Sequence, residues 1–76
     1  MNGYIKALNA GSEVVIISNN TNDDSCIFWK TCGTYYSFNR SFHVLERTDM
    51  TDDRFLAHIQ KMGQAGAQFF IRGRND

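Results

Sequence analysis

Short runs in which apolar and polar residues alternate occur along most of the chain, and this period of two is typical of strands with one buried face. The pattern predicts strands over residues 4–8, 13–18, 27–31, 34–38, 42–47 and 67–72. Turn-forming residues separate the first two runs at positions 9–12 and the next two at Cys32 and Gly33. We therefore expect a series of antiparallel hairpins.

The stretch 26–39 holds the only Trp, both Cys and two of the three Tyr, and it has the clearest hairpin pattern. A two-residue turn at Cys32 and Gly33 fixes the register of this hairpin. The expected pairs are Thr31 with Thr34, Lys30 with Tyr35, Trp29 with Tyr36, Phe28 with Ser37 and Ile27 with Phe38. We expect the core face to hold Ile27, Trp29, Tyr36 and Phe38, and the other, mixed face to hold Cys26, Phe28, Lys30, Tyr35, Ser37 and Asn39. On this prediction, Trp29→Ala should unfold the domain.

One stretch has the spacing of an amphipathic helix. Phe55, Leu56, Ile59 and Met62 recur at helical intervals, with polar residues on the opposite side. Several residues between 48 and 53 are possible N-caps, and the Asp residues there suit the positive end of a helix dipole. The helix is predicted from about residue 52 to residue 62 or 65, with Gly63 and Gly66 as candidate ends.

The predicted order is β-β-β-β-β-α-β, an α+β fold in which an antiparallel sheet of about five to six strands carries one amphipathic helix on one face. The chain of 76 residues forms a single small domain, 1–76. Six strands about 4.8 Å apart make a sheet more than about 20 Å wide, whereas a helix is only about 10–12 Å across. Apolar positions that the helix leaves bare include Tyr4, Ile17, Phe28, Tyr35 and Phe70. This mismatch favours a homodimer over a sheet that curls on itself.

Charge and composition narrow the class of protein. Eight Lys and Arg balance eight Asp and Glu, so no broad field attracts nucleic acid or an acidic membrane. The sequence contains no apolar run approaching a membrane span and no charged-then-apolar leader, so we expect a cytoplasmic protein. Residues 19–25 are all polar without periodicity, which predicts a surface loop.

Metal and catalytic chemistry have weak support in the sequence. Cys26, Cys32, His43 and His58 do not have zinc-site spacing, and the predicted hairpin holds the two sulfurs far apart. We expect reduced thiols, no metal and no cofactor. There is no Gly-rich phosphate loop and no nucleophile turn, and a thiol enzyme would need a Cys of depressed pKa. We therefore expect no enzymatic activity.

The leading hypothesis is a small protein-interaction module that acts stoichiometrically, as an inhibitor or regulator of a larger enzyme or complex. Viral or phage accessory proteins are one setting for a chain of this size. Contacts with the partner protein are expected in the polar loop and on the charged helix face, at Asp23, Asp24, Asp52, Asp53, Arg54 and Lys61.

The alternative hypothesis is single-stranded nucleic-acid binding on an aromatic sheet face. Such proteins stack bases on exposed rings and flank them with basic residues. The residues for this role are Phe28, Lys30, Tyr35 and Arg40. The balanced net charge makes this alternative the weaker one.

Overall fold

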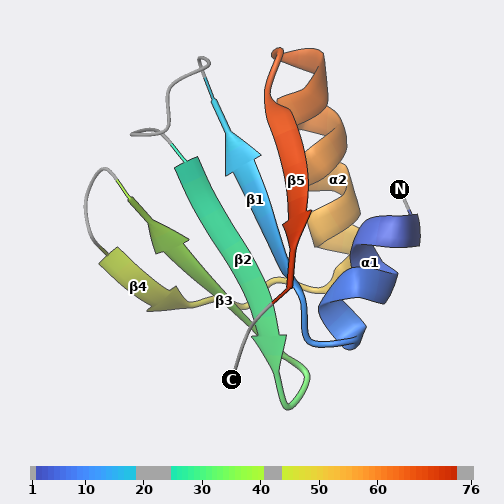
Figure 1. The fold of residues 1–76 in the computed structure, drawn as a ribbon, viewed down its shortest axis with the longest axis vertical. Coiled ribbons are helices and arrows are strands. Elements are labelled where there is room, and N and C mark those ends of the chain that lie inside the picture. The colour runs from blue at the N-terminus through green and yellow to red at the C-terminus, as the bar shows by residue number, and fades with distance from the viewer. Residues whose placement is uncertain (1, 19–24, 41–43, 74–76) are drawn as a thin grey trace.

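The computed structural model describes residues 2–18, 25–40 and 44–73. These residues form, in order, α1 (Asn2–Asn9), β1 (Glu13–Ile17), β2 (Ser25–Thr31), β3 (Thr34–Asn39), β4 (Val44–Arg47), α2 (Asp52–Gln64) and β5 (Gln68–Arg72). The five strands make one antiparallel sheet in the order β4-β3-β2-β1-β5 (Figure 1). The predicted α+β class with an antiparallel sheet is confirmed. Of the predicted strand 42–47, positions 42 and 43 lie outside the described residues, as does most of the polar loop.

The prediction of a first strand over residues 4–8 is wrong, because these residues belong to α1. A run of five residues is too short for its periodicity to separate a strand from a helix. In α1 the buried side chain is Leu8, which is 1% exposed, and Tyr4 packs one turn earlier against Phe69, with ring centroids 5.8 Å apart. The expected hairpin between 4–8 and 13–18 is therefore absent, and β1 pairs with β5 instead.

The central hairpin has the predicted register at every pair from Ile27 opposite Phe38 to Thr31 opposite Thr34. Cys32 and Gly33 both have positive φ, 52° and 79°, as the favoured two-residue hairpin turn requires. The prediction of which face forms the core is wrong. Phe28 and Tyr35 are buried, whereas Trp29 and Tyr36 point to the opposite side of the sheet and are only half-buried.

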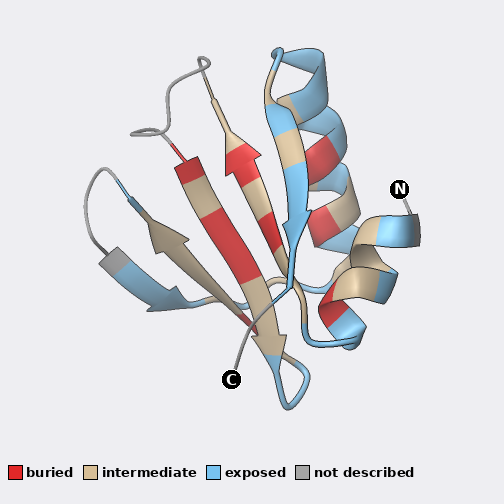
Figure 2. Cartoon of the chain, viewed as in Figure 1, coloured by how far each residue is buried: buried red, intermediate tan, exposed pale blue. Residues whose placement is uncertain are grey.

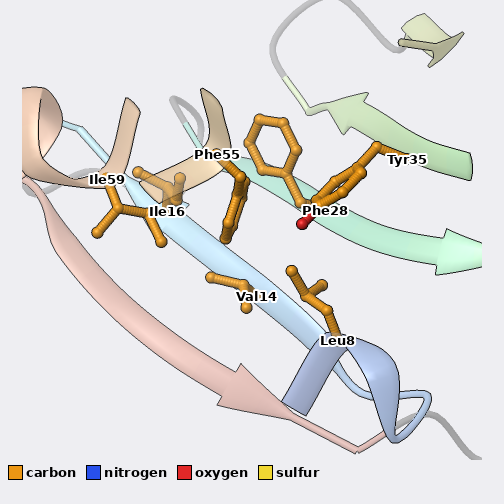
Figure 3. Packing of buried hydrophobic residues seen from close by; sticks show 7 residues of the cluster. All are labelled: Leu8, Val14, Ile16, Phe28, Tyr35, Phe55 and Ile59. Atoms are coloured by element: carbon orange, nitrogen blue, oxygen red, sulfur yellow. The ribbon is translucent and has the colours of Figure 1, made fainter. Parts of the chain in front are cut away.

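The core lies between the sheet and both helices (Figure 3). Its buried residues are Leu8 from α1, Val14 and Ile16 from β1, Phe28 from β2, Tyr35 from β3, and Phe55 and Ile59 from α2. Phe55 occupies the centre and contacts both aromatic rings, with centroids 5.3 Å from Phe28 and 5.4 Å from Tyr35. We call this side of the sheet the covered face and the other side the open face.

The predicted helix is confirmed as α2, and its ends follow the expected chemistry. The Thr51 side chain accepts a hydrogen bond from the Arg54 N–H at 3.2 Å, so Thr51 is the N-cap. The helix ends at Gln64, and Gly66 follows with φ of 91°, whereas Gly63 lies inside the last turn. Neither described helix combines the length and the apolar character that crossing a membrane requires.

Candidate interaction surface on the open face of the sheet

One row of apolar side chains crosses the whole open face. The strand registers place Leu45 of β4, Phe38 of β3, Ile27 of β2, Val15 of β1 and Phe70 of β5 side by side. We call these five residues the apolar row. At about 4.8 Å per strand, the row is about 19 Å long.

A second row beside the apolar row is aromatic at its centre and charged at its ends. Arg47 pairs with Tyr36, which pairs with Trp29, and the register of β1 and β2 continues this row to Glu13. The rings of Trp29 and Tyr36 stack with centroids 5.9 Å apart and planes inclined by 13°. At the far end, Glu13 Oε1 accepts hydrogen bonds from Arg72 Nε and Nη2, each at 3.2 Å. We call these residues the aromatic row.

Exposure is greatest at the two ends of the apolar row. Leu45 is 62% exposed and Phe70 is 50% exposed, whereas Ile27 at the centre is 9% exposed. Both helices pack on the covered face, so within the described chain the open face has no second layer (Figure 1). Figure 2 shows the edge strands β4 and β5 mainly in the exposed colour. The exposed apolar side chains of the row therefore lie at its two ends, Leu45 and Phe70, and exposed apolar surface of this kind is a candidate interaction site.

A polar cluster lies at the margin of the covered face and joins α1, the hairpin and α2. Tyr35 Oη donates to Asp52 Oδ1 at 2.5 Å, and Lys30 Nζ lies 2.7 Å from Asn9 Oδ1 and 3.3 Å from Asp52 Oδ1. Lys30 Nζ also lies over the Tyr35 ring, 5.2 Å from its centroid. These contacts hold the first turn of α2 against the hairpin.

The protonation states of these side chains suit a role in stabilising the fold. Burial and the hydrogen bond to Asp52 raise the pKa of Tyr35 well above its ordinary value, so the phenol stays protonated. The hydrogen bond from Tyr35 lowers the pKa of Asp52, and Lys30 lowers it further. The hydrogen bond from Tyr35 to Asp52 is strongest when the phenol is neutral and the carboxylate is charged, and these pKa shifts favour both forms.

The residues expected to contact a partner protein do not form one patch. Asp52 is engaged by Tyr35 and Lys30, whereas Asp53 and Arg54 are exposed in the first turn of α2 and Lys61 is exposed in its last turn. Asp23 and Asp24 lie outside the described residues. Partner binding by these side chains stays a prediction.

The residues expected to stack on nucleic acid are mostly inaccessible. Phe28 is 5% exposed and Tyr35 is 1% exposed, because both lie under the helices on the covered face. Lys30 is held by Asn9 and Asp52, and of the four expected residues only Arg40 is exposed. The expectation that Phe28 and Tyr35 present their rings to bases does not fit this placement.

The two thiols are free and lie at opposite ends of β2. Cys26 is half-buried, and burial raises its pKa, with Glu46 adding to the effect. Cys32 is exposed in the turn. His58 packs against Phe28, where burial lowers its pKa with help from Lys61, and His43 is outside the described residues.

The described ranges contain no group of three or more His, Cys, Asp or Glu arranged to hold a metal, and no pocket. The apolar row was missed in the sequence because one of its ends, Phe70, joins it only through the pairing of β1 with β5, strands that lie far apart in the chain. The signal that was available is the apolar character of both faces of the hairpin.

Comparison of the chain with protein-family models, curated proteins and solved structures finds no match.

Proposed function

We propose that this protein is a small, non-enzymatic interaction module that binds a larger protein stoichiometrically and inhibits or regulates it. The observation that supports this proposal best is the apolar row, which crosses all five strands and ends in two side chains that are 62% and 50% exposed. Removing such a surface from water contributes about 25 cal/mol per Å² of apolar area, and this favours a protein contact.

The arrangement of residue types also supports a protein partner. Trp and Tyr are the residues that dominate binding energy at protein interfaces, and here Trp29 and Tyr36 lie beside the apolar row. Charged side chains are confined to the ends of the aromatic row, so the surface has an apolar centre and a polar rim. The exposed Asp53, Arg54 and Lys61 on α2 are proposed as additional contacts.

The cellular setting belongs to the same proposal. The proposed location is the cytoplasm, and the small size of the chain suits a viral or phage accessory protein that acts on a host enzyme or complex. A homodimer is the proposed assembly. These statements are supported by composition and size, which the sequence supplies.

A capture experiment with a matched pair of variants tests the proposal. The purified wild-type protein, carrying an affinity tag, is expected to retain one protein from a cell extract, with a fixed molar ratio when the partner is titrated back. Phe70→Glu places a charge on the open face and should abolish capture. Ile71→Glu is the control, because Ile71 is 52% exposed on the same strand but points to the other side of the sheet.

Two outcomes would contradict the proposal. Capture that is equally strong in Phe70→Glu and Ile71→Glu would show that the open face does not bind the partner. Retention of an oligonucleotide that weakens steeply with added salt, without a retained protein, would favour nucleic-acid binding instead.

A further inference from the structure

We infer that two copies of this chain join edge to edge through β5, in an antiparallel strand pair with Phe70 on the two-fold axis. The inference rests on the proposed function only for the homodimer named there, and it assigns that assembly to a strand edge instead of the open face. Pairing of this kind joins the sheets of the two copies into one continuous sheet, with both open faces on the same side.

The outer side of β5 is unpaired. β1 pairs with one side of this strand, and no strand of the described chain pairs with the other, so the outward backbone N–H and C=O groups have no strand partner (Figure 1). Edge strands are commonly protected from association by Lys, Pro or a bulge. The segment Gln68–Arg72 contains neither residue, and its register with β1 is continuous over all five positions. Another strand can therefore add to β5.

The exposed apolar side chains of β5 lie on both faces of the sheet. Phe70 points to the open face and is 50% exposed, whereas Ile71 points to the covered face and is 52% exposed. A protein that docks on one face would cover only one of them. A strand paired along the edge places its own side chains on both faces, so it shields both residues. The kind of partner that fits β5 is an extended strand.

The sequence of β5 suits pairing with itself. A two-fold axis perpendicular to the sheet keeps residues of the same face opposite each other, so the possible registers differ by two residues. With Phe70 on the axis all five residues pair, and Phe69 lies opposite the partner's Ile71 and Gln68 opposite the partner's Arg72. Apolar residues then face apolar residues, and the Gln68 amide oxygen can accept a hydrogen bond from the guanidinium group. A shift of two residues opposes Phe70 to the partner's Gln68 or to the partner's Arg72 and pairs fewer residues.

The other edge strand, β4, has no equivalent match. It has 4 residues, so no residue can lie on the axis while all of them pair. The register centred on Glu46 opposes two carboxylates, and the register centred on Leu45 opposes Glu46 to an apolar position. Pairing of β4 with β5 of a second copy leaves a free edge at each end and leads to open filaments instead of a closed pair. The β5 pair is therefore the closed arrangement that the sequence favours.

Sedimentation and light scattering of the purified protein test the inference. The wild-type protein is expected to change from the monomer mass to twice that mass as its concentration rises from about 1 μM to about 1 mM. Ile71→Glu places a charge opposite the partner's Phe69 and should weaken self-association by at least about tenfold. Leu45→Lys is the control, because Leu45 is 62% exposed at the other edge of the sheet, and this variant should dimerise like the wild type. Circular dichroism would verify that both variants are folded.

A pair of substitutions at Gln68 tests the register. Gln68 is exposed, so both variants should fold like the wild type. Gln68→Glu places a carboxylate opposite the partner's Arg72 and should strengthen self-association by about two- to tenfold. Gln68→Lys places two like charges opposite each other and should weaken it by a similar factor. Added salt should reduce the difference between the two variants.

Amide hydrogen exchange locates the contact within the chain. The outward N–H groups of residues 68–72 should exchange more slowly at high protein concentration than at low concentration, because they donate to the second copy only in the dimer. Exchange in β4 should not depend on concentration. A dimer that protects β4 and leaves β5 unchanged would overturn the inference.

Other outcomes would also contradict the β5 pair. A wild-type protein that is monomeric over the whole concentration range would overturn it, and so would a dimer that persists in Ile71→Glu or is lost in Leu45→Lys. Equal self-association of the two Gln68 variants would overturn the register centred on Phe70. Ile71→Glu keeps its open face, so its capture of a partner protein measures the proposed function separately from the dimer.

Discussion

Tyr35 shows how far a residue's environment can differ from the one its sequence neighbours suggest. The alternation of the hairpin placed it on a mixed face and made it a candidate for base stacking. In the structure it is 1% exposed, and its hydroxyl donates to Asp52 at 2.5 Å. The sequence could not reveal this bond, because it depends on where the first turn of α2 lies relative to β3.

The Tyr35→Phe variant measures the contribution of that hydrogen bond. Loss of a hydrogen bond to a charged acceptor should lower the free energy of unfolding by about 1–3 kcal/mol at neutral pH, measured by urea denaturation. Tyr36→Phe on the open face is the control, with an expected change within about 0.5 kcal/mol. Equal effects of the two substitutions would contradict the role assigned to Tyr35.

The same comparison has a defined pH dependence. The pKa of Asp52 is lowered in the folded state, so its contribution is present above its ordinary value of about 4 and is lost as pH falls below that value. The pKa of Tyr35 is raised, so the unfolded chain ionises first as pH rises above about 10, and the contribution is lost there. The stability difference between wild type and Tyr35→Phe should therefore be largest between these limits.

At the scale of elements, the sequence predicted best where the signal is local. The turn at Cys32 and Gly33 was enough to predict the complete register of the hairpin. The spacing of apolar residues was enough to predict α2. The helix α1 was missed because a run of five residues is compatible with the periodicity of a strand and with that of a helix. The core face of the hairpin was misassigned because both faces are apolar, and only the packing of the helices distinguishes them. The apolar row needed the pairing of distant strands.

Two glycines near the end of α2 should respond in opposite directions to substitution by Ala. Gly66 has φ of 91°, a conformation that a side chain strains, so Gly66→Ala should cost about 1 kcal/mol. Gly63 lies inside the helix, and an added Cβ would lie 3.4 Å from the Phe69 ring, an ordinary contact. Gly63→Ala should therefore stabilise the protein by about 0.5–1 kcal/mol.

Thermal unfolding would measure this pair of effects. For a domain of this size, 1 kcal/mol corresponds to a shift of about 4–8 °C in Tm. The Gly66→Ala variant should melt earlier than the wild type and the Gly63→Ala variant later. A shift of the same sign in both would mean that the chain does not end α2 in the way described.

At the scale of the whole molecule, the fold depends on one layer of buried side chains between the sheet and two helices. The seven buried residues that form this layer are all on the covered face or on the helices. A domain of this length has a small stability margin, so the layer has little redundancy. On the open face the buried hydrophobic residue is Ile27, so this face contributes fewer buried side chains to folding, and it is the face for which we propose binding.

A pair of aromatic substitutions separates these two roles. Phe55 is 0% exposed at the centre of the core, so Phe55→Ala should cost about 3–5 kcal/mol and leave most of the chain unfolded. Trp29 is half-buried on the open face, so Trp29→Ala should keep the folded circular dichroism spectrum while weakening capture of the proposed partner protein. An unfolded Trp29→Ala variant would place the structural core on the open face, as the sequence alone had indicated.

The pairing of β1 with β5 has a consequence for how the protein refolds. β5 is the last strand of the chain, and it protects the edge of β1 that β2 does not cover. Until β5 docks, the backbone of the Glu-Val-Val-Ile-Ile run has an unprotected edge, which can recruit the same run from another refolding chain. The yield of correctly refolded protein should therefore fall as the protein concentration during refolding rises.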